Sequence, residues 1–312
     1  MSEPISAWRR LAKALRIAGG ALAAFSVCVV AASWYFTEPL HERVPATAET
    51  PATALPSAAV PSPEPAASRS LPEWPDQRLA GLDAKRILMD TVLAVGERLR
   101  GEAGYTAIFH KRERIKGKLG EDQVMEMKAR NRPFAVYFKF LNPTPGKEVV
   151  YAEGHRDGKV LAHGVGLARF LVPRLAVAPD SPIALADSRH PVTDAGLLNL
   201  TERLIAYRKL DLIQPEAETI LDRVPGPDGR DWPRSVHLHH ARTPDRLFAR
   251  VEILYDPETR IPLSISNYDW PAPGKGDETP LAERYAYEAL NFDVTLTDLD
   301  FDPANPAYQF HR

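Results

Sequence analysis

Residues 132–143, with the sequence RPFAVYFKFLNP, form the segment that most restricts how this chain can fold. Alternate side chains of a strand point to opposite faces. One face would therefore carry Phe134, Val136, Phe138 and Phe140, and the other Ala135, Tyr137, Lys139 and Leu141. The first face is wholly apolar and the second is nearly so. Because an antiparallel sheet usually leaves one face in water, this strand needs a cover on both faces, either protein or a ligand.

A helix and a run of strands surround this segment. Residues 82–100 place Leu88, Val92, Val95 and Leu99 at helical spacing, which predicts an amphipathic helix that ends at Gly101. Strands are expected near 105–115, 123–130, 134–141, 147–153 and 159–163. The Asp157–Gly158 pair suits a tight turn before the last of them.

The second half repeats this order. Thr193 is the expected N-cap of a helix that extends to about residue 210. Strand patterns then resume at 234–242, 247–255, 261–268 and 281–294. The order helix, strands, helix, strands predicts an α+β fold in which helices cover one side of a curved antiparallel sheet.

The N-terminus carries an uncharged apolar run at residues 17–36, about as long as a membrane-spanning helix. The basic residues before this run are Arg9, Arg10, Lys13 and Arg16. This charge bias predicts a cytoplasmic segment 1–16, a transmembrane anchor 17–36 and an extracytoplasmic remainder. A cleaved signal peptide, with Ala31 and Ser33 as the small residues before the cut, remains an alternative.

Residues 37–78 are rich in proline, alanine, serine and threonine. Such a composition predicts a disordered linker, because it offers few side chains to bury and many fixed backbone angles. The globular domain is therefore expected at 79–312. Together with the anchor, this organisation predicts a single-pass protein of the inner membrane with its folded domain in the periplasm.

Charge and motifs narrow the class of function. The 39 basic and 41 acidic side chains show no basic stripe with interleaved aromatic residues, so nucleic acid is not an expected partner. The chain has no G-x-S-x-G elbow, H-E-x-x-H zinc motif or phosphate-binding loop, and its one cysteine, Cys28, lies in the apolar run. We therefore expect neither an enzyme nor a bound cofactor.

Two weaker patterns suggest metal ions. In the sequence HLHH, His237 and His239 would share a face of a strand, but a metal site needs a third ligand from elsewhere, and surface histidines are the simpler interpretation. The acidic residues that begin at Asp298 resemble the start of a calcium loop, yet Pro303 and Gln309 occupy the positions of the required glycine and glutamate. No metal ligand is predicted from either pattern.

Three blocks carry a resemblance to a known family. They are the strands of residues 105–166, the helix sequence HPVTDAGLLNLTERLI and the ending LTDLDFDPANPAYQF. Over residues 85–312 the chain resembles the bacterial domain of unknown function 1571. That family is more remotely similar to the periplasmic lipoprotein carriers of the Lol system, in which helices plug the concave side of a strongly bent antiparallel sheet that forms an incomplete barrel.

The remote resemblance implies a hydrophobic hollow on the concave side of the sheet. The ligand-binding residues that it implies are Val136, Phe138 and Phe140 on the strand and Leu197, Leu200 and Leu204 on the helical plug. A sealed core with no ligand space is the alternative for the same residues. No motif residue of the carriers can be transferred to a numbered position here.

Three hypotheses of function follow. The first is a membrane-anchored envelope module that binds an apolar ligand such as a lipid or an acylated protein. The second is a sensor or scaffold that engages another envelope protein, which predicts a filled core and an exposed apolar patch. The third is a metal-dependent enzyme built around His237 and His239.

Overall fold

The structure, a computed structural model, describes residues 69–164, 174–272, 274 and 279–311. These residues all belong to one compact unit. None of the helices in these ranges has both the length and the apolarity needed to cross a membrane. The predicted anchor at 17–36 and most of the predicted linker lie outside the described residues.

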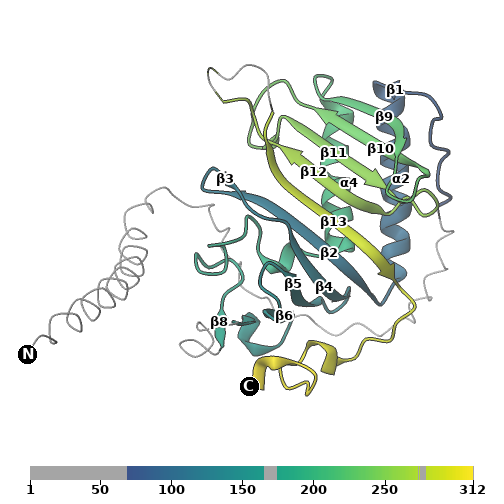
Figure 1. Cartoon of the computed structure of the whole chain (residues 1–312). Helices are drawn as coiled ribbons and strands as arrows, with labels where there is room; N and C mark the ends of the chain where they lie inside the picture. The colour runs from purple at the N-terminus through teal and green to yellow at the C-terminus, as the bar shows by residue number, and fades with distance from the viewer. Residues whose placement is uncertain (1–68, 165–173, 273, 275–278, 312) are drawn as a thin grey trace, which may run out of the picture. The chain divides into compact units, whose positions relative to one another are not determined.

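One antiparallel sheet and two helices make up most of the described chain (Figure 1). The helices are α2 (Leu82–Gly101) and α4 (Leu197–Ile213). The first strands are β1 (Leu79–Ala80), β2 (Gly104–Ile115), β3 (Lys118–Leu119), β4 (Gln123–Arg130), β5 (Ala135–Asn142), β6 (Glu148–Ala152), β7 (Val160–His163) and β8 (Leu175–Val177). The later strands are β9 (Glu218–Pro225), β10 (Asp231–Leu238), β11 (Arg250–Tyr255), β12 (Pro262–Tyr268) and β13 (Leu281–Asn291).

The strand order is β1-β9-β10-β11-β12-β13-β2-β4-β5-β6-β7-β8, with β3 paired to β2 at the side. Within the described residues the end strands β1 and β8 do not pair with each other, so the sheet stays open. The central pair joins β2 to the last strand, β13. The α+β class and the open antiparallel sheet are confirmed.

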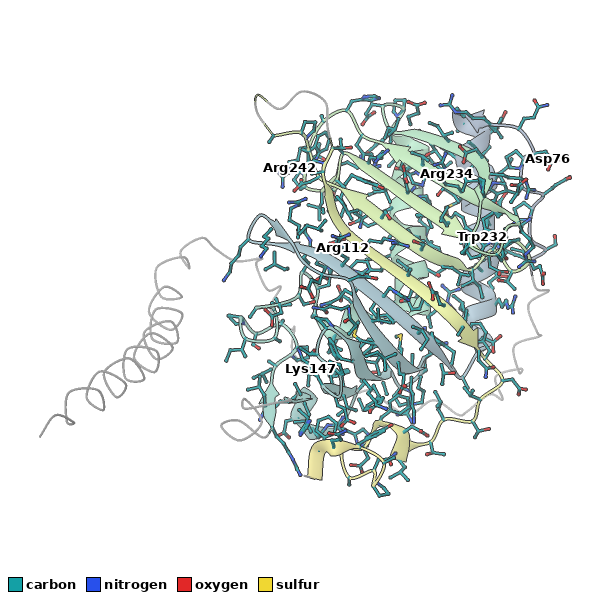
Figure 2. The ribbon with its side chains drawn as sticks, in the orientation of Figure 1. Asp76, Arg112, Lys147, Trp232, Arg234 and Arg242 are labelled. Atoms are coloured by element: carbon teal, nitrogen blue, oxygen red, sulfur yellow. The ribbon has the colours of Figure 1, made fainter. Side chains whose placement is uncertain are left out.

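Both helices cover the same face of the sheet, which we call the inner face. The residues that were predicted to form one stripe of α2, namely Leu88, Val92, Val95 and Leu99, are at most 2% exposed. They pack against inner-face side chains such as Ile253 and Tyr105. Figure 2 shows Arg112 and Arg234 on the opposite, outer face of the sheet. The helix-covered sheet that the element order predicted is therefore observed.

Strand β5 is covered on both faces by protein. On the inner face, Val136, Phe138 and Phe140 pack in one cluster with Leu197 of α4. On the outer face, Tyr137 packs with residues of the C-terminal segment in a separate cluster. Two protein layers therefore explain why the strand is apolar on both sides.

The C-terminal segment that covers the outer face contains the short 3-10 helices η4 (Asp298–Phe301) and η5 (Gln309–His311). The rings of Tyr137 and Tyr308 stack with centroids 4.0 Å apart. Glu148, which is 1% exposed, accepts hydrogen bonds from the Tyr137 hydroxyl at 3.0 Å and from the backbone N–H of Gln309 at 2.7 Å. These contacts fix the segment across β5 and β6.

The folded chain begins earlier than the predicted boundary at residue 79. Trp74 is 1% exposed, and its indole N–H donates to the carbonyl oxygen of Asp222 at 3.0 Å. Its ring lies 5.2 Å from that of Tyr255. Residues near Trp74 therefore belong to the fold, although their composition resembles that of the linker before them.

The start of α4 also differs from the prediction. The N-cap is Gly196, whose φ of 98° favours glycine, and Thr193 lies in the short 3-10 helix η3 (Val192–Asp194) before it. The carbonyl oxygen of Thr193 instead accepts a hydrogen bond from the Asn199 side chain at 3.0 Å.

The structure also contains β9, a strand that was not predicted from the sequence.

Candidate functional site

Five of the six predicted ligand-binding residues are buried side chains. Val136 and Leu197 are 0% exposed, Leu204 is 4% exposed, and Phe138 and Phe140 are 7% exposed, whereas Leu200 is partly buried. Five of them belong to the inner-face cluster around β5, and Leu204 belongs to the neighbouring cluster under α2. Leu197 and Leu200 therefore pack in the same cluster as the strand residues, whereas Leu204 packs in the cluster under α2.

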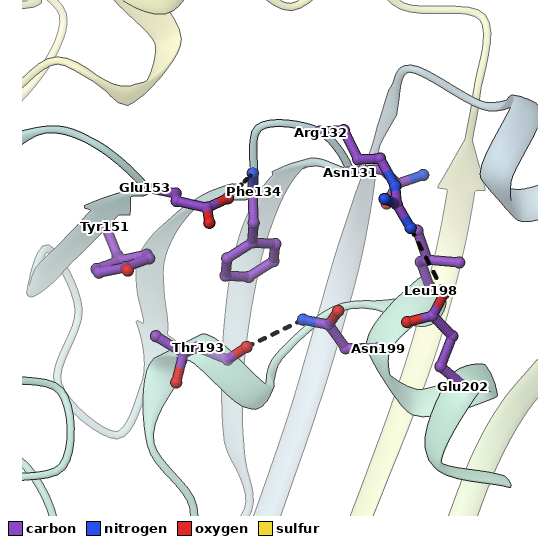
Figure 3. Close-up of a pocket in the computed structure, with 9 residues that line it drawn as sticks. All are labelled: Asn131, Arg132, Phe134, Tyr151, Glu153, Thr193, Leu198, Asn199 and Glu202. Atoms are coloured by element: carbon purple, nitrogen blue, oxygen red, sulfur yellow. Dashed lines mark hydrogen bonds and ion pairs between the residues drawn. The ribbon is translucent and has the colours of Figure 1, made fainter. Parts of the chain in front are cut away.

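A pocket of about 310 Å³ opens beside this cluster (Figure 3). Its lining residues are Asn131, Arg132, Phe134, Tyr151, Glu153, Thr193, Leu198, Asn199 and Glu202. They come from the turn before β5, the end of β6, η3 and the first turns of α4. None of the six predicted ligand-binding residues is among them.

The apolar part of the pocket lining, which we call its floor, consists of Phe134, Tyr151 and Leu198, and polar groups make up the larger share of the lining. The rings of Phe134 and Tyr151 lie 6.0 Å apart, and Leu198 is 4% exposed. Tyr151 is placed by the register of the sheet, in which it pairs with Val136 of β5. All three side chains belong to, or pack against, the inner-face cluster, so the floor continues the apolar core outward.

The rim of the pocket is polar, and several of its groups are fixed by the protein. The side-chain N–H groups of Asn131 donate to the carbonyl oxygens of Leu99 and Glu102, at 3.0 and 2.8 Å. One carboxylate oxygen of Glu153 accepts from the backbone N–H of Phe134 at 3.0 Å. These bonds anchor the turn before β5 at the pocket edge.

Sequence patterns identified only part of this site. Phe134 was expected on the apolar face of β5, whereas Leu198 was not among the predicted ligand-binding residues. The polar residues gave no signal, because Asn131 and Asn199 are isolated amides in the sequence. Only the hydrogen bonds of the folded turn and helix bring these amides to the same opening.

A second polar cluster lies on the inner face, where Glu113 of β2 is directly paired with Glu283 of β13. Both carboxylates are buried, at 5% and 2% exposure. Arg189 bonds to Glu283 at 2.6 Å, and His190 lies 3.0 Å from the same oxygen. The hydroxyl of Tyr285 donates to Glu113 at 2.5 Å. These pairs hold the segment around residue 190 against the middle of the sheet.

The pKa of Glu283 is lowered. Burial alone would raise it, but the hydrogen bond and charge of His190, the hydrogen bond from Asn267 and the charge of Arg189 together outweigh that effect. The ionised carboxylate therefore stabilises the fold above the ordinary glutamate pKa, about 4.3. This stabilisation is lost as the pH falls through the lower pKa of the folded chain.

Glu283→Gln is expected to make acid unfolding less steep. The variant loses one proton-linked contribution, so the slope of unfolding free energy against pH should fall by up to about 1.4 kcal/mol per pH unit in the acid range. Urea unfolding followed by circular dichroism between about pH 3 and 7 measures this slope. The exposed Glu121→Gln serves as the control and should leave the slope unchanged. Parallel pH curves for wild type and Glu283→Gln would contradict the assignment.

The histidines of the HLHH sequence were interpreted as surface residues, and this interpretation is wrong for His237. This side chain is 0% exposed, with its ring nitrogens 3.1 Å from the Ser235 hydroxyl and 3.3 Å from the Thr219 hydroxyl. Burial lowers the pKa of His237 well below its ordinary value, and the nearby charge of Arg208 lowers it further. His237 therefore serves as a neutral, hydrogen-bonded core residue.

His239 lies just beyond the end of β10, and its Nδ1 donates to the carbonyl oxygen of Phe248 at 2.8 Å. In the part of the chain that the structure describes, no group of three or more histidine, cysteine, aspartate or glutamate side chains is placed to hold a metal ion. The described residues therefore do not supply the third ligand that the metal-enzyme hypothesis requires beside His237 and His239.

A buried ionic cluster lies next to His237. Asp211 is 1% exposed and forms ion pairs with Arg246 at 2.7 Å and with Arg208 at 3.1 Å. The two arginines are 5% and 4% exposed. Burial lowers the pKa of Arg208, while the charge of Asp211 opposes this effect. The cluster joins the end of α4 to the connection between β10 and β11.

The acidic residues that begin at Asp298 have structural partners. Asp298 bonds to Arg130 at 2.5 Å, and Asp300 bonds to Lys128 at 2.7 Å. Asp300 also accepts the backbone N–H of Thr297, which completes a capping box at the start of η4. The alternating carboxylates therefore fasten the C-terminal segment to β4.

The chain belongs to the family of proteins of unknown function DUF1571, whose family model matches residues 102–310. The predicted membership is confirmed, although the matched range begins after α2 instead of at residue 85. A comparison with curated proteins finds no match.

Solved structures with a similar fold include a DUF1329 family protein from Desulfovibrio piger, at 12% identity and a TM-score of 0.37, covering 71% of this chain and 97% of that one. A LolA superfamily protein from Nitrosomonas europaea is similar at 8% identity and a TM-score of 0.29, covering 69% of this chain and 97% of that one. The expected remote similarity to LolA-type proteins is therefore found, at a level too low to indicate function.

Proposed function

We propose that this chain is a non-enzymatic module of the bacterial cell envelope that binds an apolar group of a ligand, such as a lipid or an acylated protein. The observation that supports this proposal best is the pocket floor of Phe134, Tyr151 and Leu198, which continues the inner-face core to an opening with a polar rim. Small-molecule sites commonly combine such a floor with a few fixed polar groups.

The proposal places the pocket in the periplasm. Its support is the apolar run at residues 17–36, which has four basic residues before it and only one arginine, Arg43, shortly after it, followed by the proline- and alanine-rich linker. An anchor of this kind would hold the folded domain near the inner membrane, where lipids and acylated proteins are available.

A second candidate is a sensor or scaffold that binds another envelope protein. The packed contact between β5 and α4 favours it, because a filled inner face leaves the outer surfaces to make contacts. The two candidates differ in whether a small apolar molecule remains with the purified protein.

Native mass spectrometry of the full chain, purified from membranes in detergent without added lipid, tests the proposal. We expect a retained mass of a lipid or acyl group, and Phe134→Ala should weaken its binding by about tenfold or more, since a buried phenylalanine ring contributes roughly 1.5–3 kcal/mol. The control is Phe248→Ala, at a half-buried ring that does not line the pocket. Absence of any retained mass, together with capture of a defined protein partner, would favour the scaffold instead.

A further inference from the structure

Several side-chain oxygens of the pocket lining can accept hydrogen bonds from a ligand. Both side-chain N–H groups of Asn199 are used inside the protein, toward the carbonyl oxygens of Thr193 and Ala195 at 3.0 and 2.8 Å. Asn131 likewise uses its N–H groups on the protein, on Leu99 and Glu102. The side-chain oxygens of both amides have no partner among the described residues, so each remains an acceptor.

The carboxylates of the rim add to this set. Glu153 uses one oxygen on the backbone N–H of Phe134, and the other has no partner in the described chain. Figure 3 shows the Glu153 side chain beside those of Phe134 and Tyr151. The ion pairs of Glu202 with Arg100, at 3.3 Å, and with Arg132, at 3.6 Å, use only its Oε1 atom.

The charges and aromatic rings of the pocket lining also favour a cationic ligand. Arg132 is the one cation among the nine lining residues; its side chain is 70% exposed and is paired to Glu202. Two carboxylates against one arginine leave the lining with a net negative charge. The aromatic faces of Phe134 and Tyr151 attract cations as well.

We propose that the pocket recognises a primary ammonium group carried on an apolar stem, with the ammonium group on the free oxygen of Glu153, next to the rings of Phe134 and Tyr151, and the stem toward Leu198. This inference rests on the proposed function and names the chemistry of its ligand. A volume of about 310 Å³ suits a stem of a few carbon atoms. Such a group occurs at the end of a lysine side chain and in the head group of an aminolipid.

Binding of three matched probes tests the proposal. The full chain in detergent is titrated with n-butylammonium, 1-butanol and butyrate, followed by saturation-transfer NMR. Butylammonium should bind at least about tenfold more tightly than butanol, because a hydrogen bond to a charged group contributes about 1.5–3 kcal/mol. Butyrate should bind more weakly than butanol. Equal binding of butanol and butylammonium would overturn the ammonium assignment and leave the apolar site intact, whereas failure of all three would count against both.

Two variants test whether the Glu153 carboxylate is the group that binds the ammonium ion. Glu153→Gln should remove most of the preference for butylammonium over butanol, and it keeps an acceptor for the Phe134 backbone N–H. The matched control Glu126→Gln, at an exposed position on the outer face of β4, should keep the preference. An unchanged preference in Glu153→Gln would contradict the proposed geometry. Lysine blocked only at its backbone, as the Nα-acetyl methylamide with a free side-chain ammonium group, and a short-chain aminolipid, compared in the same assay, distinguish a peptide source from a lipid source.

Discussion

Phe138→Ala is expected to lower the free energy of unfolding by about 3–5 kcal/mol, the usual range for phenylalanine truncation in a packed core. Phe138 is 7% exposed and lies 5.6 Å, ring to ring, from Phe109 on the inner face. Removing its ring would leave a void that the surrounding strands and α4 cannot easily fill. Urea unfolding followed by circular dichroism measures the loss.

The control on the same strand is Leu141→Ala, at a side chain that is 39% exposed, where we expect a change within about 0.5 kcal/mol. Tyr137 is not a neutral control, because its ring is buried against Tyr308 on the other face. A loss below about 1.5 kcal/mol for Phe138→Ala, together with acyl-probe binding at that position, would show a ligand hollow beside β5 in place of a sealed core.

Asp211→Asn is expected to destabilise the fold by a similar amount, about 3–5 kcal/mol. The carboxylate is the partner of two buried guanidinium groups, Arg208 and Arg246, and neutralising it leaves both cations in a dry environment. The amide keeps the size of the side chain, so the loss reports charge and not volume. Thermal and urea unfolding at neutral pH measure it.

Asp83→Asn provides a matched comparison, because Asp83 pairs with Arg86 three residues along α2, as Arg208 and Asp211 do along α4. The side chains of Asp83 and Arg86 are 75% and 64% exposed, so water screens the pair and the expected loss is below about 1 kcal/mol. Equal losses in the two variants would mean that burial does not strengthen the Asp211 cluster.

Local patterns predicted most of the regular elements. The stripe of α2 and the alternation of β4 and β5 were recognised because their apolar spacing matches the helical and strand periods. Strand β9 was missed, since its alternation is short and is interrupted by Asp222 and Arg223. Asp222 accepts a hydrogen bond from Arg234, and Arg223 donates one to the carbonyl oxygen of Trp74. Neither partner can be predicted from the local sequence pattern.

Long-range contacts also decided the features that sequence reasoning placed wrongly or left open. The cover on the outer face of β5 comes from Tyr308, far along the chain, so periodicity could show the need for a cover but not its source. His237 resembles a surface residue next to two other histidines, yet the pairing of β10 with β9 and β11 puts it under α4. The pocket depends on amide orientations that only the folded turn and helix define.

The pairing of β2 with β13 has a consequence for how the chain reaches its native state. Phe109 and Tyr287 are direct neighbours in the sheet, so their contact closes a loop of roughly 180 residues. Two half-sheets can form early from local hairpins, but they join only when the last strand arrives. Folding should accordingly be slow for a domain of this size, as in other proteins of high contact order. During synthesis, β2 would remain an unpaired edge toward β13 until residue 291 has left the ribosome.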